Sequence, residues 1–185
     1  AGVRGVNEAR KLQVCFVIPS LAPGGTERQL LYLLAGLRDT HACHVICTRE
    51  EGAWFSAAQN AGATVHTLNT LGGWDLRIGP RVARQFRALK PQIVHTFLFG
   101  LDLAVNRAAR RAGVPVLISS RRELAAWMKT RHIRAQRKAN ELVDCIVANS
   151  NAVATLEIPV SDPPTQAEVQ QVLSKMNELI TALRR

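Results

Sequence analysis

A glycine-rich turn between an apolar run and a helical pattern is the stretch of this chain best suited to chemistry. The apolar run 14–18 is followed by Gly24 and Gly25, and then by Thr26 and Gln29, which fit a capping box at a helix start. A helix N-terminus offers free backbone N–H groups and the positive end of the helix dipole, which suit a phosphate. The alternative is a tight strand–helix connection without a ligand.

Charged and polar residues near this turn and after later apolar runs are the other candidates. Arg28 lies in the first turn of the predicted helix, where it either adds charge for a phosphate or is a solvated surface side chain. Further polar groups follow three apolar runs, at 95–96, 119–122 and 149–151. Arg121 and Arg122 are candidates for contacts with an acceptor phosphate or carboxylate, and we group Glu123 with them.

The elements that must position these groups alternate between strand and helix. Short continuous apolar runs are typical of parallel strands that are covered on both faces. We expect strands at 12–18, 44–48, 64–68, 93–96, 116–119 and 145–148, and helices at 26–37, 54–61, 80–89, 101–112 and 122–142. This predicts an α/β, Rossmann-like, doubly wound parallel sheet of about six strands, on which ligands bind beyond the carboxyl ends of the strands. The candidate groups would gather at that edge.

Composition limits the class of protein and its partners. The chain has 185 residues, 47% of them hydrophobic, and a formal charge of +10, which indicates a folded domain with an anionic partner. The four cysteines have no Cys-x-x-Cys spacing and lie in or beside apolar runs, which favours reduced, buried thiols in a cytoplasmic protein and no metal site. We find no signal peptide and no membrane-spanning run, so any membrane attachment would be peripheral, on the inner face.

The last part of the chain differs from the rest. We divide the sequence into a domain at 11–153, a proline-rich linker at 154–164 and a C-terminal amphipathic helix at 165–185. In that helix, apolar residues from Val169 to Leu183 recur at steps of three and four for two heptads. The helix either docks on its own domain or makes a homodimer.

Several motifs, in their order and spacing, resemble one family. The chain from Val14 to about Val153 resembles the N-terminal, acceptor-side domain of family 4 glycosyltransferases, which have the two-domain GT-B fold. The motifs are Ile18-Pro-Ser-Leu-Ala-Pro-Gly-Gly-Thr-Glu-Arg28, Gly73-Trp-Asp-Leu76, Lys90-Pro-Gln-Ile-Val-His-Thr96, Ala112-Gly-Val-Pro-Val-Leu-Ile-Ser-Ser-Arg-Arg-Glu123 and Val147-Ala-Asn-Ser-Asn-Ala-Val153.

The resemblance implies that a sugar passes from a nucleotide-sugar donor to an acceptor with retention at the anomeric carbon. It implies no required metal and no cofactor besides the donor substrate. In the family the glycine turn approaches the donor phosphates, a role that the resemblance carries over to Gly24, Gly25 and Thr26. Backbone N–H groups there would stabilise charge on the leaving diphosphate.

The sequence departs from the family in two ways. Many members have His-x-His after the fourth strand, but here the second histidine is replaced by Phe97, so His95 is either a catalytic-site residue or a histidine at the edge of the core. The family's C-terminal, donor-binding domain has no counterpart after about Val153. We therefore expect weak donor binding and little or no transfer from this chain alone.

The predicted long helix carries a basic face. Its basic residues, with one Trp, suit an anionic membrane surface or a lipid-linked acceptor. The alternative is a solvated helix whose apolar side packs on the sheet. The candidate membrane-surface residues are Trp127, Lys129, Arg131, Arg134, Arg137 and Lys138.

Three other classes of function are alternatives to the transferase. A non-catalytic binding or scaffold module with the same fold remains open, and Phe97 and the lack of a second domain favour it for this chain in isolation. A nucleotide-cofactor oxidoreductase is disfavoured because Gly-x-Gly-x-x-Gly is absent after the first strand. Nucleic-acid binding is unlikely because no helix-turn-helix, RNP or zinc pattern occurs.

Overall fold

The strands of this protein come from its continuous apolar runs, and helices lie between them. The computed structural model describes residues 11–71, 75, 77–97, 100–122, 130–148 and 174. Along the described residues the elements are β1 Leu12–Ile18, α1 Gly25–Leu37, β2 His41–Cys47, α2 Phe55–Asn60, β3 Ala63–Thr67, α3 Ile78–Leu89, β4 Ile93–Thr96, α4 Asp102–Arg111, β5 Val116–Arg121, α5 Thr130–Asn140 and β6 Cys145–Ala148.

These strands form one sheet in the order β3-β2-β1-β4-β5-β6. Every neighbouring pair is parallel, which confirms the predicted doubly wound sheet. The chain passes outward from β1 to β3 and then returns to place β4 on the other side of β1. Open α/β sheets bind ligands outside the carboxyl ends of the strands at such a reversal. The topology therefore directs attention to the residues that follow Ile18 and Thr96.

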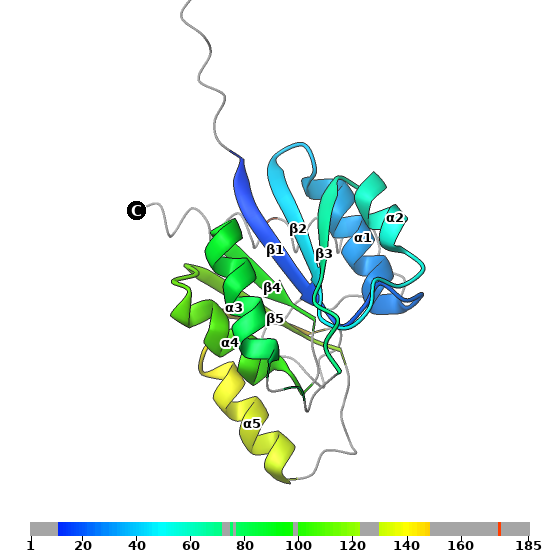
Figure 1. Ribbon diagram of the computed structural model, residues 1–185. Helices are drawn as coiled ribbons and strands as arrows, with labels where there is room; N and C mark the ends of the chain where they lie inside the picture. The colour runs from blue at the N-terminus through cyan, green and yellow to red at the C-terminus, as the bar shows by residue number, and fades with distance from the viewer. Residues whose placement is uncertain are drawn as a thin grey trace, which may run out of the picture.

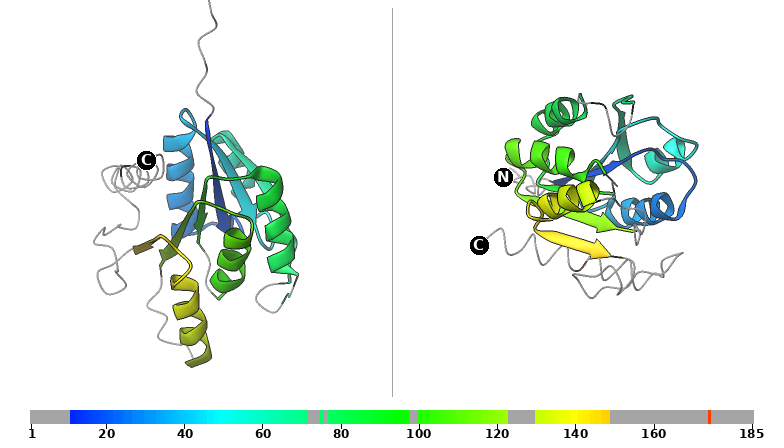
Figure 2. Two further views of the ribbon diagram at one scale, coloured as in Figure 1. Left: turned by 90° about the vertical axis from the view of Figure 1, so that its left-hand side faces the viewer. Right: turned by 90° about the horizontal axis from the view of Figure 1, so that it is seen from below.

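Helices cover both faces of the sheet (Figures 1 and 2). Consecutive residues of β1 point to opposite faces, so Phe16 packs with Leu34 of α1 while Val17 packs with Phe86 of α3. These side chains are at most 1% exposed, and burying each contributes about 1.5–3 kcal/mol. The two apolar layers hold the carboxyl edge of the sheet in place.

The predicted starts of α1 and α3 are wrong. Helix α1 begins at Gly25 with Gly24 as its N-cap, so Thr26 lies inside the first turn and is not the capping residue. The Gly24 carbonyl already accepts a hydrogen bond from Arg28 N at 3.0 Å, which starts the helix earlier. Helix α3 begins at Ile78, so Pro80 is its third residue, where its missing N–H is still unneeded.

The cysteines, the C-terminal part and the predicted absence of membrane-spanning helices can be compared with the described residues. The four cysteines are buried, as predicted. The linker 154–164 lies outside the described residues, and so does the helix 165–185 apart from residue 174, so dimerisation through 169–183 stays a prediction. None of the helices in the described part is long and apolar enough to cross a membrane. The described residues also contain no group of three or more His, Cys, Asp or Glu placed to hold a metal.

Candidate functional site

Backbone hydrogen bonds from the loop that follows β2 hold the turn between β1 and α1 in place. Leu21 N donates to Glu51 O at 2.9 Å, and Trp54 N donates to Leu21 O at 2.9 Å. The Leu21 side chain is fully buried. The backbone that leads into Gly24 is therefore fixed before any ligand arrives.

Gly52 makes this support possible. Its φ is +83°, a left-handed conformation that favours glycine, and a Cβ there would collide with the backbone of Leu21 and Ala22. The role of Gly52 was not predicted from the sequence. Its only local signal is a glycine shortly after a strand, which does not reveal which backbone packs against it.

An anionic oxygen already lies against the glycine turn. A Cβ at Gly24 would collide with Oε2 of Glu27. Gly24 has extended backbone, with φ of −169°, which any residue adopts, and the atom that a Cβ would meet is the end of a flexible side chain that can move aside. Burial raises the pKa of Glu27, while its own backbone N–H and then Arg122 lower it. The turn thus accommodates a carboxylate at a helix N-terminus, within electrostatic reach of Arg122.

A stack of three side chains lines the edge at β4 and β5. His95 is 1% exposed, and its Nε2 lies 2.8 Å from the Ser120 hydroxyl. Phe97 stacks on His95 with ring centroids 4.2 Å apart, and the Arg122 guanidinium lies 5.2 Å from the Phe97 ring centroid. Burial, and then the charge of Arg122, lower the pKa of His95 to about 3. His95 is thus a neutral ring at the edge of the core, and a direct catalytic role for it stays a prediction.

Arg121 turns inward, away from the position expected for an acceptor contact. Its guanidinium lies 3.5 Å from Asp102 and donates to the Ser119 hydroxyl and to Asn140 Oδ1, each at 2.6 Å. Ser119 in turn lies 2.9 Å from the Thr96 hydroxyl. Burial raises the pKa of Asp102 to about 6, with Arg121 the largest opposing influence. This buried network ties β4 and β5 to α4 and α5.

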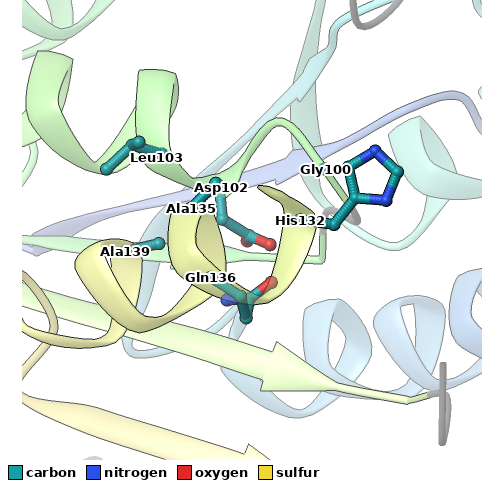
Figure 3. A pocket seen from close by; sticks show the side chains of 7 residues that line it. All are labelled: Gly100, Asp102, Leu103, His132, Ala135, Gln136 and Ala139. Atoms are coloured by element: carbon teal, nitrogen blue, oxygen red, sulfur yellow. The ribbon is translucent and has the colours of Figure 1, made fainter. Parts of the chain in front are cut away.

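A small cavity lies beside the network, between α4 and α5. Figure 3 shows Asp102 from α4 and His132 and Gln136 from α5 around it. Its volume is about 40 Å³, room for a few waters, whereas ligand pockets occupy about 300–1,000 Å³. The lining residues are Gly100, Asp102, Leu103, His132, Ala135, Gln136 and Ala139.

The structure brings some predicted site residues together and separates others. Gly24, Gly25 and Thr26 share the edge with Arg122, while Arg28 is exposed on the first turn of α1. The basic residues of α5 lie elsewhere, and Arg131, Arg134, Arg137 and Lys138 are exposed. Glu123, Trp127 and Lys129 lie outside the described residues.

The order of the strands and the glycine turn at the reversal define the class of domain. This is a Rossmann-like domain whose carboxyl edge presents the N-terminus of α1 and, among the described residues, the Arg122 guanidinium. The glycosyl transferase 4-like domain family matches residues 24–162, and the chain belongs to that family. The resemblance to the N-terminal domain of family 4 glycosyltransferases is confirmed. No curated protein matches the chain.

Solved structures share the fold. HepE from Anabaena, in complex with UDP-glucose, superposes with a TM-score of 0.62 at 19% identity, covering 76% of this chain and 38% of that one. A putative UDP-N-acetylglucosamine 2-epimerase from Listeria monocytogenes gives a TM-score of 0.53 at 16% identity, covering 77% and 40%. The chain therefore matches about 40% of the length of these structures.

Proposed function

We propose that this chain is the acceptor-side half of a retaining glycosyltransferase that uses a nucleotide-sugar donor. The family match over residues 24–162 carries the proposal. The position of the glycine turn at the sheet reversal supports it. The HepE structures contain UDP or UDP-glucose, which fits the donor class. Retention and independence from metal follow from the family resemblance.

In this proposal the donor diphosphate approaches Gly24 and Gly25. The turn already accommodates the Glu27 carboxylate, so an anion can come close to its backbone. Donor binding then displaces Glu27, and Arg122 shifts its electrostatic attraction from that carboxylate to the phosphates. Backbone N–H groups and a fixed cation would stabilise the leaving diphosphate more than the bound donor, which lowers the barrier to transfer.

In this proposal Arg122 supplies the polar group that the second histidine of the His-x-His motif supplies in other family members. Phe97 stands at that position, between the His95 ring and the Arg122 guanidinium. His95 is buried and neutral, so it supplies no positive charge at the ring stack. The cation in contact with the stack is Arg122. We assign Arg122 to phosphate or acceptor binding and His95 to positioning Phe97.

A donor-binding domain completes the site in this proposal. This chain covers about 40% of the solved structures it matches, and a GT-B site lies between two domains. We expect little or no sugar transfer by the 185 residues alone. A donor-binding domain of the same family, supplied separately, should restore transfer.

The test measures nucleoside diphosphate release and sugar incorporation with a panel of nucleotide sugars, with and without the second domain. We expect turnover only with both domains, unchanged by a metal chelator, and a product whose anomeric NMR signal matches the donor configuration. Absence of both donor binding and turnover in either arrangement contradicts the enzyme assignment. Donor or acceptor binding without turnover supports instead the scaffold alternative, which Phe97 favours because it removes a polar group from the edge.

A basic surface on α5 supports a membrane-associated acceptor. Arg131, Arg134, Arg137 and Lys138 are exposed, and Ile133 among them is 41% exposed. The helix packs on α4, where the Asn106 side chain donates to Ala139 O at 3.2 Å. This arrangement fits attachment to the inner face of a membrane that contains anionic lipids.

We predict that replacing Arg134 and Arg137 by glutamine weakens binding to anionic vesicles about thirtyfold. The reason is that each basic residue near such a surface contributes about 1 kcal/mol. The matched control replaces Arg84 and Arg87, which are exposed on α3 with the same spacing. Flotation with anionic and with neutral vesicles measures the effect. Equal binding to both kinds of vesicle, or an equal loss in the control, would remove the assignment of this surface.

A further inference from the structure

Two histidines on the outer strands of the sheet converge outside the proposed transferase site. His44 of β2 and His66 of β3 are half-buried, with Nδ1 of His44 3.3 Å from Nε2 of His66. Their ring centroids are 5.5 Å apart, with planes inclined by 33°. Strands β2 and β3 lie on the opposite side of β1 from β4 and β5. The pair is therefore separate from the stack of His95, Phe97 and Arg122.

The parallel register explains why the rings meet. His44 pairs with Thr64 and His66 pairs with Ile46, so the two histidines are diagonal neighbours on one face of the sheet. Such a meeting depends on which residues pair across strands. The sequence alone, with 21 residues between the two histidines, gives no sign of it.

We propose that His44 and His66 form a binding site for a divalent transition-metal ion such as Zn²⁺ or Ni²⁺. Imidazole nitrogens suit these ions, whereas Mg²⁺ prefers oxygen ligands. Zn–N bonds of about 2.0–2.1 Å at a tetrahedral angle place two nitrogens about 3.3–3.4 Å apart. The observed separation of 3.3 Å lies within this range.

Gln13 fixes the tautomer of His44 that can bind a metal through Nδ1. Nε2 of His44 lies 2.8 Å from Gln13 Oε1, so its N–H donates to that oxygen. This places the proton of the neutral ring on Nε2 and leaves the Nδ1 lone pair directed at His66. Metal-binding histidines commonly donate their second N–H to a carbonyl oxygen in this manner.

The protonation state also favours a metal at neutral pH. Burial, and then the proximity of His66, lower the pKa of His44, and burial lowers that of His66. Both rings are therefore neutral near pH 7, the form that binds metal. On binding, the His66 proton moves to Nδ1. The two rings supply two ligands, and water or an oxygen of a bound molecule takes the remaining positions.

The test is calorimetry of the untagged full chain with Zn²⁺ and Ni²⁺, together with ¹⁵N NMR of the histidine rings. We expect one ion per chain and metal-dependent shifts at Nδ1 of His44 and Nε2 of His66. His66→Ala should weaken binding at least tenfold, and Gln13→Leu should weaken it by about tenfold or more. His132→Ala, at a half-buried histidine of α5, is the control and should have no effect.

Three results would overturn the proposal. They are absence of binding at millimolar metal, ring shifts confined to other histidines, and equal weakening in His66→Ala and His132→Ala. The ring shifts are measured on the unaltered chain, so the test does not depend on a variant that folds. The experiment is also independent of sugar transfer.

Discussion

Replacing Arg121 by methionine lowers the free energy of unfolding by about 3 kcal/mol at pH 8. The Arg121 side chain is 12% exposed and that of Asp102 is 2% exposed, and they form an ion pair at 3.5 Å. Removing one partner leaves a buried carboxylate without its counter-charge. It also leaves Asn140 Oδ1 and the Ser119 hydroxyl without the guanidinium that binds both. Chemical unfolding followed by circular dichroism measures the loss.

The loss should shrink at pH 5. Folding raises the pKa of Asp102 from 3.8 to about 6, so the protonated carboxyl favours the folded state and its stabilisation is lost as pH rises through 6. At pH 5 most Asp102 side chains are protonated, and the ion pair with Arg121 is already weakened. At pH 8 the carboxylate is ionised and depends on Arg121. The penalty for Arg121→Met therefore grows as pH rises from 5 to 8.

Arg122→Met is the matched control. It removes the neighbouring guanidinium, whose contact with the Phe97 ring is worth about 0.5–1 kcal/mol. Equal penalties for the two variants, or a penalty for Arg121→Met that does not change with pH, would contradict the buried network. A smaller effect of Arg122→Met is expected because its contact with Phe97 lies outside the buried ion pair of Arg121 and Asp102.

Replacing Gly24 by valine is expected to weaken nucleoside diphosphate binding at least tenfold while the fold persists. The extended backbone of Gly24, with φ of −169°, accepts any side chain. A Cβ would, however, fill the space where Oε2 of Glu27 now lies and where we place a donor phosphate. NMR titration with UDP measures affinities too weak for calorimetry.

Two further variants make this result specific. Glu27→Gln should strengthen binding severalfold, because it removes a negative charge from the end of α1 that the diphosphate must occupy. Gly79→Val, at a position of α3 where a Cβ meets nothing within 4 Å, should leave binding unchanged. If Gly24→Val binds UDP as the unaltered chain does, the diphosphate does not approach this turn.

Local sequence patterns predicted the sheet because each strand is a continuous apolar run and each helix has its own periodicity. They also predicted that Gly24 and Arg122 would share an edge, since parallel strands end on the same side. Side-chain pairing between distant segments was not predictable in this way. In the sequence, Arg121 and Arg122 are equivalent candidates. In the structure, Asp102, which lies 19 residues earlier, forms an ion pair with Arg121.

Other features depend on three-dimensional contacts in the same way. Gly52 matters because of the backbone of Leu21, which comes from a different loop. His44 and His66 meet only through the register of β2 and β3. The capping-box prediction at Thr26 was wrong because Gly24 needs no side chain to start α1. The sequence therefore predicts the carboxyl edge of the sheet as the site. Which polar side chains at that edge are buried depends on packing between distant segments.

An amide NMR titration of this chain with nucleotide sugars tests directly whether the donor diphosphate binds at the glycine turn. UDP-glucose and a guanosine-diphosphate sugar are added in separate series up to millimolar concentration. We expect saturable shifts that are largest at residues 24–28 and extend to Arg122. No shifts with any donor, or largest shifts around the cavity between α4 and α5, would contradict this expectation.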